Sequence, residues 1–206
     1  MPGKLAITNS CSDNRFARVG GEALVGGVVG WPESPDGRPL TLLVSLPTEF
    51  LNRNAGFNLP AEHFISVFSY SPEDEYFLDC ITYHGSQEEL DWLRRGFTRV
   101  LFHRQGEPIS SAAKLPSMRL EVDGANLALA DSSSGSKIGG SPSLLQAEPL
   151  ALNDEKFALQ LYAGSFPAGY QGVMGLSDAV GYLFVSSKPL RKGEALDAGT
   201  FFIQVT

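Results

Sequence analysis

Short apolar runs rich in β-branched and aromatic residues recur along this chain, separated by glycines, prolines and polar turns. Six runs have the length of typical strands: Leu40–Leu46, His63–Tyr70, Tyr76–Tyr83, Phe157–Tyr162, Gly181–Ser187 and Phe201–Val205. Several of them alternate between apolar and polar residues, as a strand does when one of its faces lies on a core. The pattern predicts strands packed on a common core.

Two similar motifs introduce these runs. Arg18-Val-Gly-Gly21 precedes the first three, and Lys137-Ile-Gly-Gly140 precedes the last three. The matching order predicts a duplicated β unit, with halves at about 18–124 and 137–205. A Ser-rich loop at Asp131–Ser136 would join them, and at 206 residues we expect one domain that spans the whole chain.

One segment has a helical pattern instead. Ser86-Gln-Glu-Glu89 has the Ser-x-x-Glu form of a capping box, and Arg94 and Arg95 stand before Gly96 at the expected end of the helix. A strand at Phe97–His103 and a second short helix at Asn126–Ala130 complete the prediction. The fold class is α+β and mainly β: two pseudo-repeated β units packed as one domain with one or two short helices.

The composition bears on the expected cellular location of the protein. Hydrophobic residues make up 43% of the chain, but no run approaches the roughly 20 apolar residues that a membrane-spanning helix needs. The first residues lack the apolar segment of a secretory signal, so we expect a cytoplasmic protein. In that compartment the two cysteines, Cys11 and Cys80, would remain free thiols.

The formal charge of −7 comes from one segment. Seven of the 23 acids lie between Glu73 and Asp91, where there is no lysine or arginine, and the other 16 acids balance the 16 basic residues. Arg94, Arg95, Arg99 and Arg104 follow directly, so the region is also a dipole. Such an acidic surface disfavours nucleic acid and anionic membranes and favours a basic partner.

Aromatic residues are interleaved with these acids, as in many protein interfaces. The candidate partner-binding residues are Glu73, Asp74, Glu75, Tyr76, Asp79, Glu88, Glu89, Asp91 and Trp92. A charge run of this kind is either a solvated face or a docking surface, and both readings stay open.

Signatures of catalysis are weak. The glycines of Val19–Gly30 lack the Gly-Lys-Ser/Thr end of a phosphate loop, and Ser134-Gly-Ser-Lys137 lacks the companion motifs of Ser-x-x-Lys enzymes. His84 stands four residues after Cys80, a spacing that would place both on one face of a strand, with His63 and His103 elsewhere in the chain. We predict no catalytic residues, no metal site and no cofactor.

The order of several short motifs resembles the DUF1963 family, also called YwqG-like proteins. The motifs are the two glycine pairs, Trp31-Pro32 followed by Gly37-Arg-Pro-Leu40, Phe157-Ala-Leu-Gln160, and Ser177-Asp178-Ala179 before the run from Gly181. Departures include Glu22 where the family has proline, Leu42-Leu-Val-Ser45 without the family's glutamine, and Ser177 where the family has glycine. The resemblance, over about 18–205, implies a fold more firmly than a shared ligand.

Some members of that family are encoded as immunity proteins beside bacterial toxins. The resemblance thus implies a non-catalytic binding protein that neutralises a cognate antibacterial toxin of a type VI or related system, such as a nuclease, by occlusion. The alternative is a small-ligand or metal-binding domain with a site between the halves, near Gly20-Gly21, Gly139-Gly140, Gln160 and Asp178. An unrecognised hydrolase that uses Ser134 and His84 is a third possibility.

Overall fold

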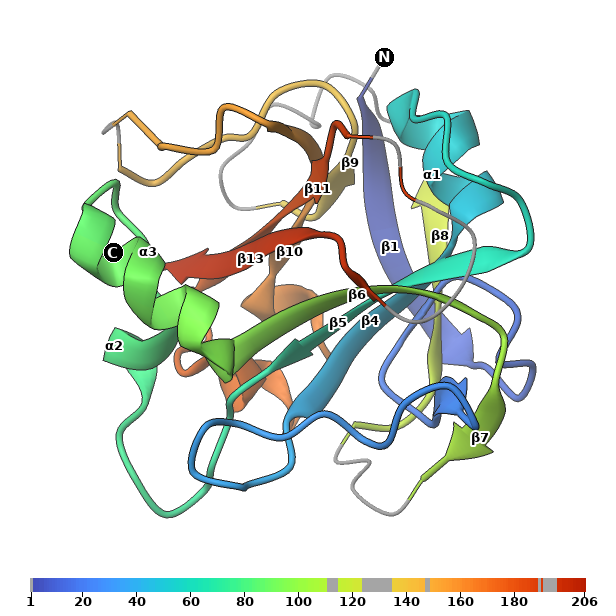
Figure 1. Ribbon diagram of the computed structural model, residues 1–206, viewed down its shortest axis with the longest axis horizontal. Coiled ribbons are helices and arrows are strands. Elements are labelled where there is room, and N and C mark those ends of the chain that lie inside the picture. The colour runs from blue at the N-terminus through green and yellow to red at the C-terminus, as the bar shows by residue number, and fades with distance from the viewer. Residues whose placement is uncertain (1, 111–114, 124–134, 147–148, 189, 191–195) are drawn as a thin grey trace.

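The computed structural model describes residues 2–110, 115–123, 135–146, 149–188, 190 and 196–206. Eleven strands of these residues form one antiparallel sheet that curves until its ends nearly meet (Figure 1). In spatial order they are β12 (Leu196–Asp197), β6 (Thr98–Arg104), β5 (His63–Ser69), β4 (Thr41–Pro47), β2 (Arg18–Val19), β8 (Met118–Asp123), β1 (Gly3–Ser10), β9 (Lys137–Ile138), β10 (Glu155–Tyr162), β11 (Val180–Ser186) and β13 (Gly199–Gln204). The prediction of a mainly β fold is confirmed.

Smaller elements surround this sheet. A second sheet pairs β3 (Ala23–Gly26) with β7 (Glu107–Ile109). The helices are α1 (Thr48–Ala55), α2 (Leu78–Ile81), α3 (Gln87–Trp92), the π-helical turn η1 (Leu93–Phe97) and the 3₁₀ turns η3 (Ala163–Ser165) and η4 (Gln171–Met174). In Figure 1, α2 and α3 lie together at one side of the sheet and α1 lies at the other. None of the helices in the described residues has the length and apolarity needed to cross a membrane.

One segment joins the two ends of the sheet. β12 pairs with β6 and β13 pairs with β11, and only Ala198 separates β12 from β13. The Ala198 amide donates to the Val100 carbonyl at 2.7 Å, and its carbonyl accepts from the Ser186 amide at 2.7 Å. Ala198 therefore bridges β6 and β11 across the seam of the sheet.

Strands β4 and β5 bury both of their faces. All seven residues of β5 are buried and so are the first six of β4, because one face points into the interior of the sheet and the other is covered. A single cluster of buried apolar side chains includes residues of both predicted halves, among them Leu43, Phe68, Leu159 and Phe202. Both halves thus contribute to one core.

The two glycine pairs occupy similar positions in the sheet. Gly20 donates its amide to the Leu43 carbonyl at 3.1 Å, and Gly139 donates to the Ala158 carbonyl at 2.8 Å. All four glycines have φ between 59° and 77°, a left-handed conformation that glycine adopts readily. Each pair follows a two-residue strand with buried side chains, β2 or β9.

The prediction of a strand at Tyr76–Tyr83 is wrong, because that segment contains helix α2. Phe77 and Ile81 are both buried and stand four residues apart, which is helical spacing. The Thr82 amide donates to the Leu78 carbonyl at 2.9 Å, as one helical turn requires. The other five apolar runs contain strands at nearly the predicted bounds, and β6 confirms the strand predicted after the capped helix.

The sequence analysis did not predict β1, β8 or α1. Helix α1 ends at Gly56, whose φ of 66° is that of a left-handed cap, and Leu51 and Ala55 form its buried face. A turn-forming glycine and an i, i+4 apolar pair are the signals that mark this helix in the sequence. The helix predicted at Asn126–Ala130 and most of the Ser-rich loop lie outside the described residues.

Candidate protein-binding site

The acidic segment folds into a small helical lobe, residues 73–92, which contains α2 and α3. Tyr83 attaches the lobe to the sheet: its side chain is fully buried, its hydroxyl accepts from the Ala151 amide at 2.8 Å, and its amide donates to the Ile203 carbonyl at 3.3 Å. The Gln204 side chain donates to the Tyr83 carbonyl at 3.1 Å. The lobe is therefore fixed on β13 before any partner arrives.

Helix α3 begins with the capping box that the sequence predicts. The Glu89 amide donates to the Ser86 hydroxyl at 3.2 Å, and the Ser86 amide donates to the Glu89 carboxylate at 3.3 Å. Glu89 also accepts from the His84 amide and from His84 Nδ1, both at 2.8 Å. Burial raises the pKa of Glu89, but these hydrogen bonds outweigh it, so the pKa lies below its usual value.

Removing this cap should loosen the lobe. We expect Ser86→Ala to lower the free energy of unfolding by about 1 kcal/mol, because the Glu89 amide loses its acceptor. Urea unfolding measures the loss, and hydrogen exchange should locate it in α3. Ser187→Ala removes an exposed hydroxyl elsewhere and serves as the control. Equal stability of the two variants would show that the cap contributes nothing.

The first acids of the lobe have partners within the chain. Arg38 donates to Asp74 at 2.7 Å and lies 3.8 Å from Glu75. The Tyr70 hydroxyl donates to Glu75 and to Asp36, the latter at 3.1 Å. Burial and these two acids raise the pKa of Tyr70, so the phenol stays protonated and acts as a donor. Asp74 and Glu75 therefore hold the loop before α2 in place.

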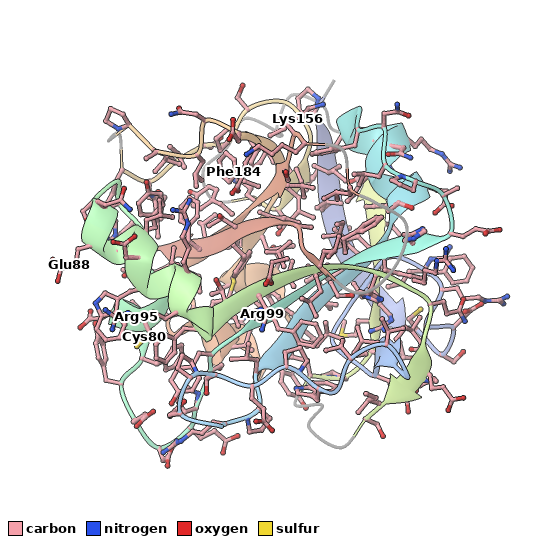
Figure 2. The ribbon with its side chains drawn as sticks, in the orientation of Figure 1. Cys80, Glu88, Arg95, Arg99, Lys156 and Phe184 are labelled. Atoms are coloured by element: carbon pink, nitrogen blue, oxygen red, sulfur yellow. The ribbon has the colours of Figure 1, made fainter. Side chains whose placement is uncertain are left out.

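Other side chains of the lobe are exposed and have few contacts within the chain. Tyr76 is 71% exposed, and its hydroxyl donates to Asp79 at 3.1 Å. Glu73 and Glu88 are exposed and form no ion pair with any described residue. Figure 2 shows Glu88 pointing outward from α3, away from the sheet. Glu73 and Glu88 can reach a partner without breaking a contact within the described residues, and Tyr76 can do so by giving up at most one hydrogen bond.

Trp92 is only partly free. It is 36% exposed, and the Arg95 guanidinium lies 4.0 Å from its ring centroid as a cation–π contact. Asp91 accepts from Gln87 at 2.7 Å. Three of the nine predicted partner-binding residues have at most one side-chain hydrogen bond within the described part of the chain: Glu73, Tyr76 and Glu88. The other six have side-chain contacts within the chain: Asp74, Glu75, Asp79, Glu89, Asp91 and Trp92.

Two features of this surface were not predicted from the sequence. A cavity of about 410 Å³ lies beside Glu73 and Asp74, and it is lined also by Arg38, Pro39, Tyr70 and Pro72. Leu176, which is 42% exposed, follows Gly175, and Gly175 lies against Leu78 of α2. The acidic surface thus borders a pocket and an exposed leucine, to which the distant segments around Arg38 and Gly175 contribute.

A scan against protein-family models finds no match for this chain, and a search of curated proteins finds none either. The resemblance to the DUF1963 family rests on its short motifs alone.

The residues of the alternative site have different surroundings in the described part of the chain. Gly139 and Gly140 line a cavity of about 330 Å³ beside the end of α1. Gln160 is fully buried, where it accepts from the Ser143 amide at 3.0 Å and donates to the Gly135 carbonyl at 2.7 Å. Asp178 is exposed and accepts from the Thr206 hydroxyl at 3.0 Å. Gln160 therefore fastens a loop to β10, and the surroundings of these residues are those of structural groups.

The residues considered for metal or acyl-transfer chemistry are also separated. Cys80 lies on a helix, so the shared strand face with His84 does not exist, and His84 is bonded to Glu89. Among the described residues, no group of three or more His, Cys, Asp or Glu side chains is placed to hold a metal ion. Ser134 lies outside the described residues.

A serine–histidine pair that the sequence analysis missed lies inside the sheet. His103 Nδ1 lies 2.7 Å from the Arg104 carbonyl and must donate to it, so Nε2 accepts from the Ser66 hydroxyl at 2.8 Å. Ser66 in turn lies 3.0 Å from the Ser45 hydroxyl. Because all three residues are fully buried, no substrate can reach them, and the chain of hydrogen bonds joins β4, β5 and β6.

This buried histidine predicts acid sensitivity. Burial lowers the pKa of His103, the hydrogen bond to Arg104 opposes this, and the charges of His63 and Arg18 lower the pKa further. The unfolded chain therefore takes up a proton at higher pH than the folded one. We expect the free energy of unfolding to fall below about pH 6.5, by at most about 1.4 kcal/mol per pH unit from this group.

Urea unfolding at about pH 7.5 and about pH 5.5 tests this in the wild type and in His103→Asn. The half-buried Glu155, whose pKa is raised by desolvation, acts in the opposite direction, but it is present in both proteins. The change in the free energy of unfolding between the two pH values, compared between the two proteins, gives the contribution of His103. An equal change with pH in both would contradict the assignment.

Proposed function

We propose that this protein is a non-catalytic binding domain that docks a basic protein partner on the helical lobe, residues 73–92. The exposure of Tyr76 carries the proposal: a tyrosine that is 71% exposed stands between acids on a lobe already fixed by a capping box and by buried Tyr83. Tyrosine side chains are frequent energetic centres of interfaces because they bury a large area and lose few rotamers.

The charge of the lobe supports a basic partner. Acids concentrated on one face attract a positively charged surface during diffusion and raise the rate of association more than the final affinity. A lobe that is ordered before binding also avoids the entropy cost of folding on its partner. The lobe therefore has what fast capture of a basic protein needs: exposed acids, an exposed aromatic side chain and a rigid support.

The more specific proposal is that the partner is an antibacterial toxin and that this protein is its immunity protein. It rests on the sequence resemblance to proteins encoded beside such toxins. A nuclease fits best, because its active-site cleft must be positively charged to bind phosphate groups. Carboxylates of the lobe would then occupy that cleft in place of the nucleic acid.

Co-expression tests this function. Each neighbouring gene is expressed in a sensitive host with and without this protein, and the complex is recovered through a tag on the neighbour. We expect one neighbour to be toxic, to be neutralised and to co-purify in equal amount. If no neighbour is toxic, or if the toxic one is neutralised without forming a complex, the proposal fails.

We also propose that the two halves are copies of one β unit. Arg18 pairs with Ser45 as Lys137 pairs with Gln160, and both units have an irregularity of register at the residue that accepts the glycine amide, Leu43 or Ala158. The helical lobe interrupts the first unit between β5 and β6. Related sequences provide the test: the two units should be more alike in some relatives, and units that share nothing but the glycine pairs would contradict a duplication.

A further inference from the structure

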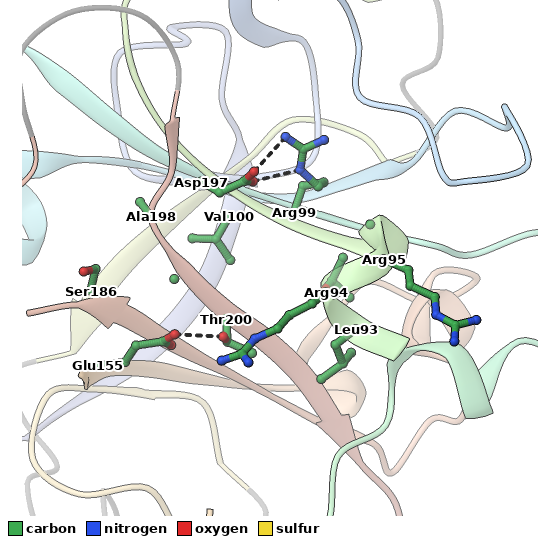
Figure 3. A pocket seen from close by; sticks show the side chains of 13 residues that line it. Leu93, Arg94, Arg95, Arg99, Val100, Glu155, Ser186, Asp197, Ala198 and Thr200 are labelled. Carbon is green, nitrogen blue, oxygen red and sulfur yellow. Dashed lines mark hydrogen bonds and ion pairs between the residues drawn. The ribbon is translucent and has the colours of Figure 1, made fainter. Parts of the chain in front are cut away.

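A cavity of about 490 Å³ lies on the seam where the sheet closes, apart from the exposed acids of the helical lobe (Figure 3). One wall comes from η1 and the start of β6, and the other from β10, β11, β12 and β13. The volume is within the range of small-molecule sites, about 300 to 1,000 Å³. Leu93, Val100 and Ala198 are among the cavity's lining residues but are buried, so the exposed lining is mostly polar.

The charged groups of this seam pocket are not equivalent. Arg99 and Asp197 satisfy each other through two hydrogen bonds, at 2.8 and 3.1 Å. Arg95 also lines the cavity, but its guanidinium stacks on Trp92 and is directed to the side opposite Arg94 (Figure 3). Arg94 extends across the cavity toward Thr200 and Glu155, and it has no ion pair or hydrogen bond with any described residue (Figure 3). Arg94 is therefore the cation available to a ligand.

Glu155 faces Arg94 from the opposite wall. One of its carboxylate oxygens accepts from the Thr200 hydroxyl at 3.0 Å, and the other, Oε2, is buried without a hydrogen-bond partner among the described residues. An unpartnered buried carboxylate oxygen is costly when it is charged. Burial raises the pKa of Glu155, whereas its hydrogen bonds with Thr200 and the charge of Arg94 lower it and the neighbouring Asp154 raises it.

We propose that the seam pocket binds a small monocarboxylate, with Arg94 as its anchor. A planar guanidinium donates two parallel hydrogen bonds to a carboxylate, which fixes the ligand in orientation. A dianion such as phosphate is disfavoured because Glu155 and Asp197 line the same cavity. The remaining volume of the cavity accommodates the rest of a small ligand.

Binding should be linked to proton uptake by Glu155. A bound carboxylate repels the ionised Glu155 and favours its protonated form, which can donate a hydrogen bond to the ligand. The other charged groups near this carboxyl are Arg94 on η1, the paired Arg99 and Asp197, and Asp154, which pairs with Lys188 at 2.8 Å. Affinity for the acid should therefore increase as the pH falls toward the pKa of Glu155.

Amide chemical-shift titration with acetate, butyrate, hexanoate and benzoate tests the proposal. We expect saturable shifts at Gly199 and Thr200 with the carboxylates, and weaker binding of inorganic phosphate. Arg94→Met should weaken binding about tenfold or more, because a charge-assisted pair is lost. Arg95→Met is the matched control and should bind like the wild type.

Glu155→Gln tests the proposal through an increase in affinity, which an unfolded variant could not show. It keeps an acceptor for Thr200 but removes the negative charge, so the variant should bind the acid more tightly than the wild type at about pH 8 and should lose the dependence on pH. The amide spectrum without ligand shows whether each variant is folded. No saturable shift in the wild type, equal binding by Arg94→Met, or phosphate bound as tightly as the acids would overturn the proposal.

Discussion

Replacing Gly20 with alanine should destabilise the protein by about 3 kcal/mol, whereas the same change at Gly37 should cost only about 1 kcal/mol. Both glycines have positive φ, 59° at Gly20 and 79° at Gly37, so both variants place alanine in a left-handed conformation. The two positions differ in the room available for a side chain. A Cβ at Gly20 would lie 2.5 Å from Leu115 Cβ and from the Pro116 carbonyl oxygen, but a Cβ at Gly37 would meet nothing within 4 Å.

Urea unfolding of both variants separates steric overlap from backbone strain. Gly139→Ala extends the comparison to the second glycine pair, where φ is 70° and a Cβ would lie 2.8 Å from the Asn54 carbonyl oxygen. We expect it to resemble Gly20→Ala. If Gly20→Ala and Gly139→Ala lose as little stability as Gly37→Ala, the backbone at the glycine pairs can shift to make room for a Cβ. Close contacts with neighbouring atoms would then not explain why glycine occupies these positions.

Truncating Tyr76 to alanine should weaken binding of the partner about 30-fold, which corresponds to about 2 kcal/mol. The change removes the most exposed aromatic side chain of the lobe, and its one hydrogen bond, to Asp79, joins two exposed residues, so the fold should be unaffected. Most of the effect should appear in the dissociation rate, since contacts made after docking are lost. Surface plasmon resonance measures both rate constants.

Phe16→Ala is the matched control for Tyr76→Ala. Phe16 is 43% exposed and lies under the Arg119 guanidinium, away from the helical lobe. Its truncation should leave the affinity unchanged. If the two variants bind alike, the partner does not dock on Tyr76.

The sequence predicted most of the sheet because the decisive signals are local. Val, Ile, Phe and Tyr in short runs marked β4, β5, β10, β11 and β13, and a Ser-x-x-Glu motif marked α3. The segment around Leu78 was predicted wrongly since apolar residues at i and i+4 were hidden in a run that also fits a strand. β8 has only one fully buried residue, Leu120, so its pattern is too weak to find.

The sequence predicts which residue types make up the candidate site, but it does not predict the contacts that these residues form. The concentration of acids at 73–91 is visible in the sequence, yet the partner of Asp74 is Arg38, 36 residues earlier. The seam pocket combines Arg94 with Glu155 and Thr200, which only the closure of the sheet brings together. Interactions between such distant residues follow from the fold and leave no local pattern.

The same contacts decide which acids can test the proposed function. Reversing the charge of Asp74 or Glu89 would break the Arg38 contact or the capping box, so a loss of binding would not distinguish misfolding from a lost interface. Glu73 and Glu88 have no such role among the described residues. Glu62 and Glu107 are exposed acids outside the lobe, and their reversal changes the net charge equally.

The rate of association with the co-purified partner, measured at low and high salt, tests the docking surface most directly. Glu73→Lys/Glu88→Lys should slow association about tenfold at low salt and should flatten its salt dependence, because acids that steer the partner have become basic. Glu62→Lys/Glu107→Lys should associate nearly as fast as the wild type. Equal association rates for the two double variants would contradict docking on the acidic lobe.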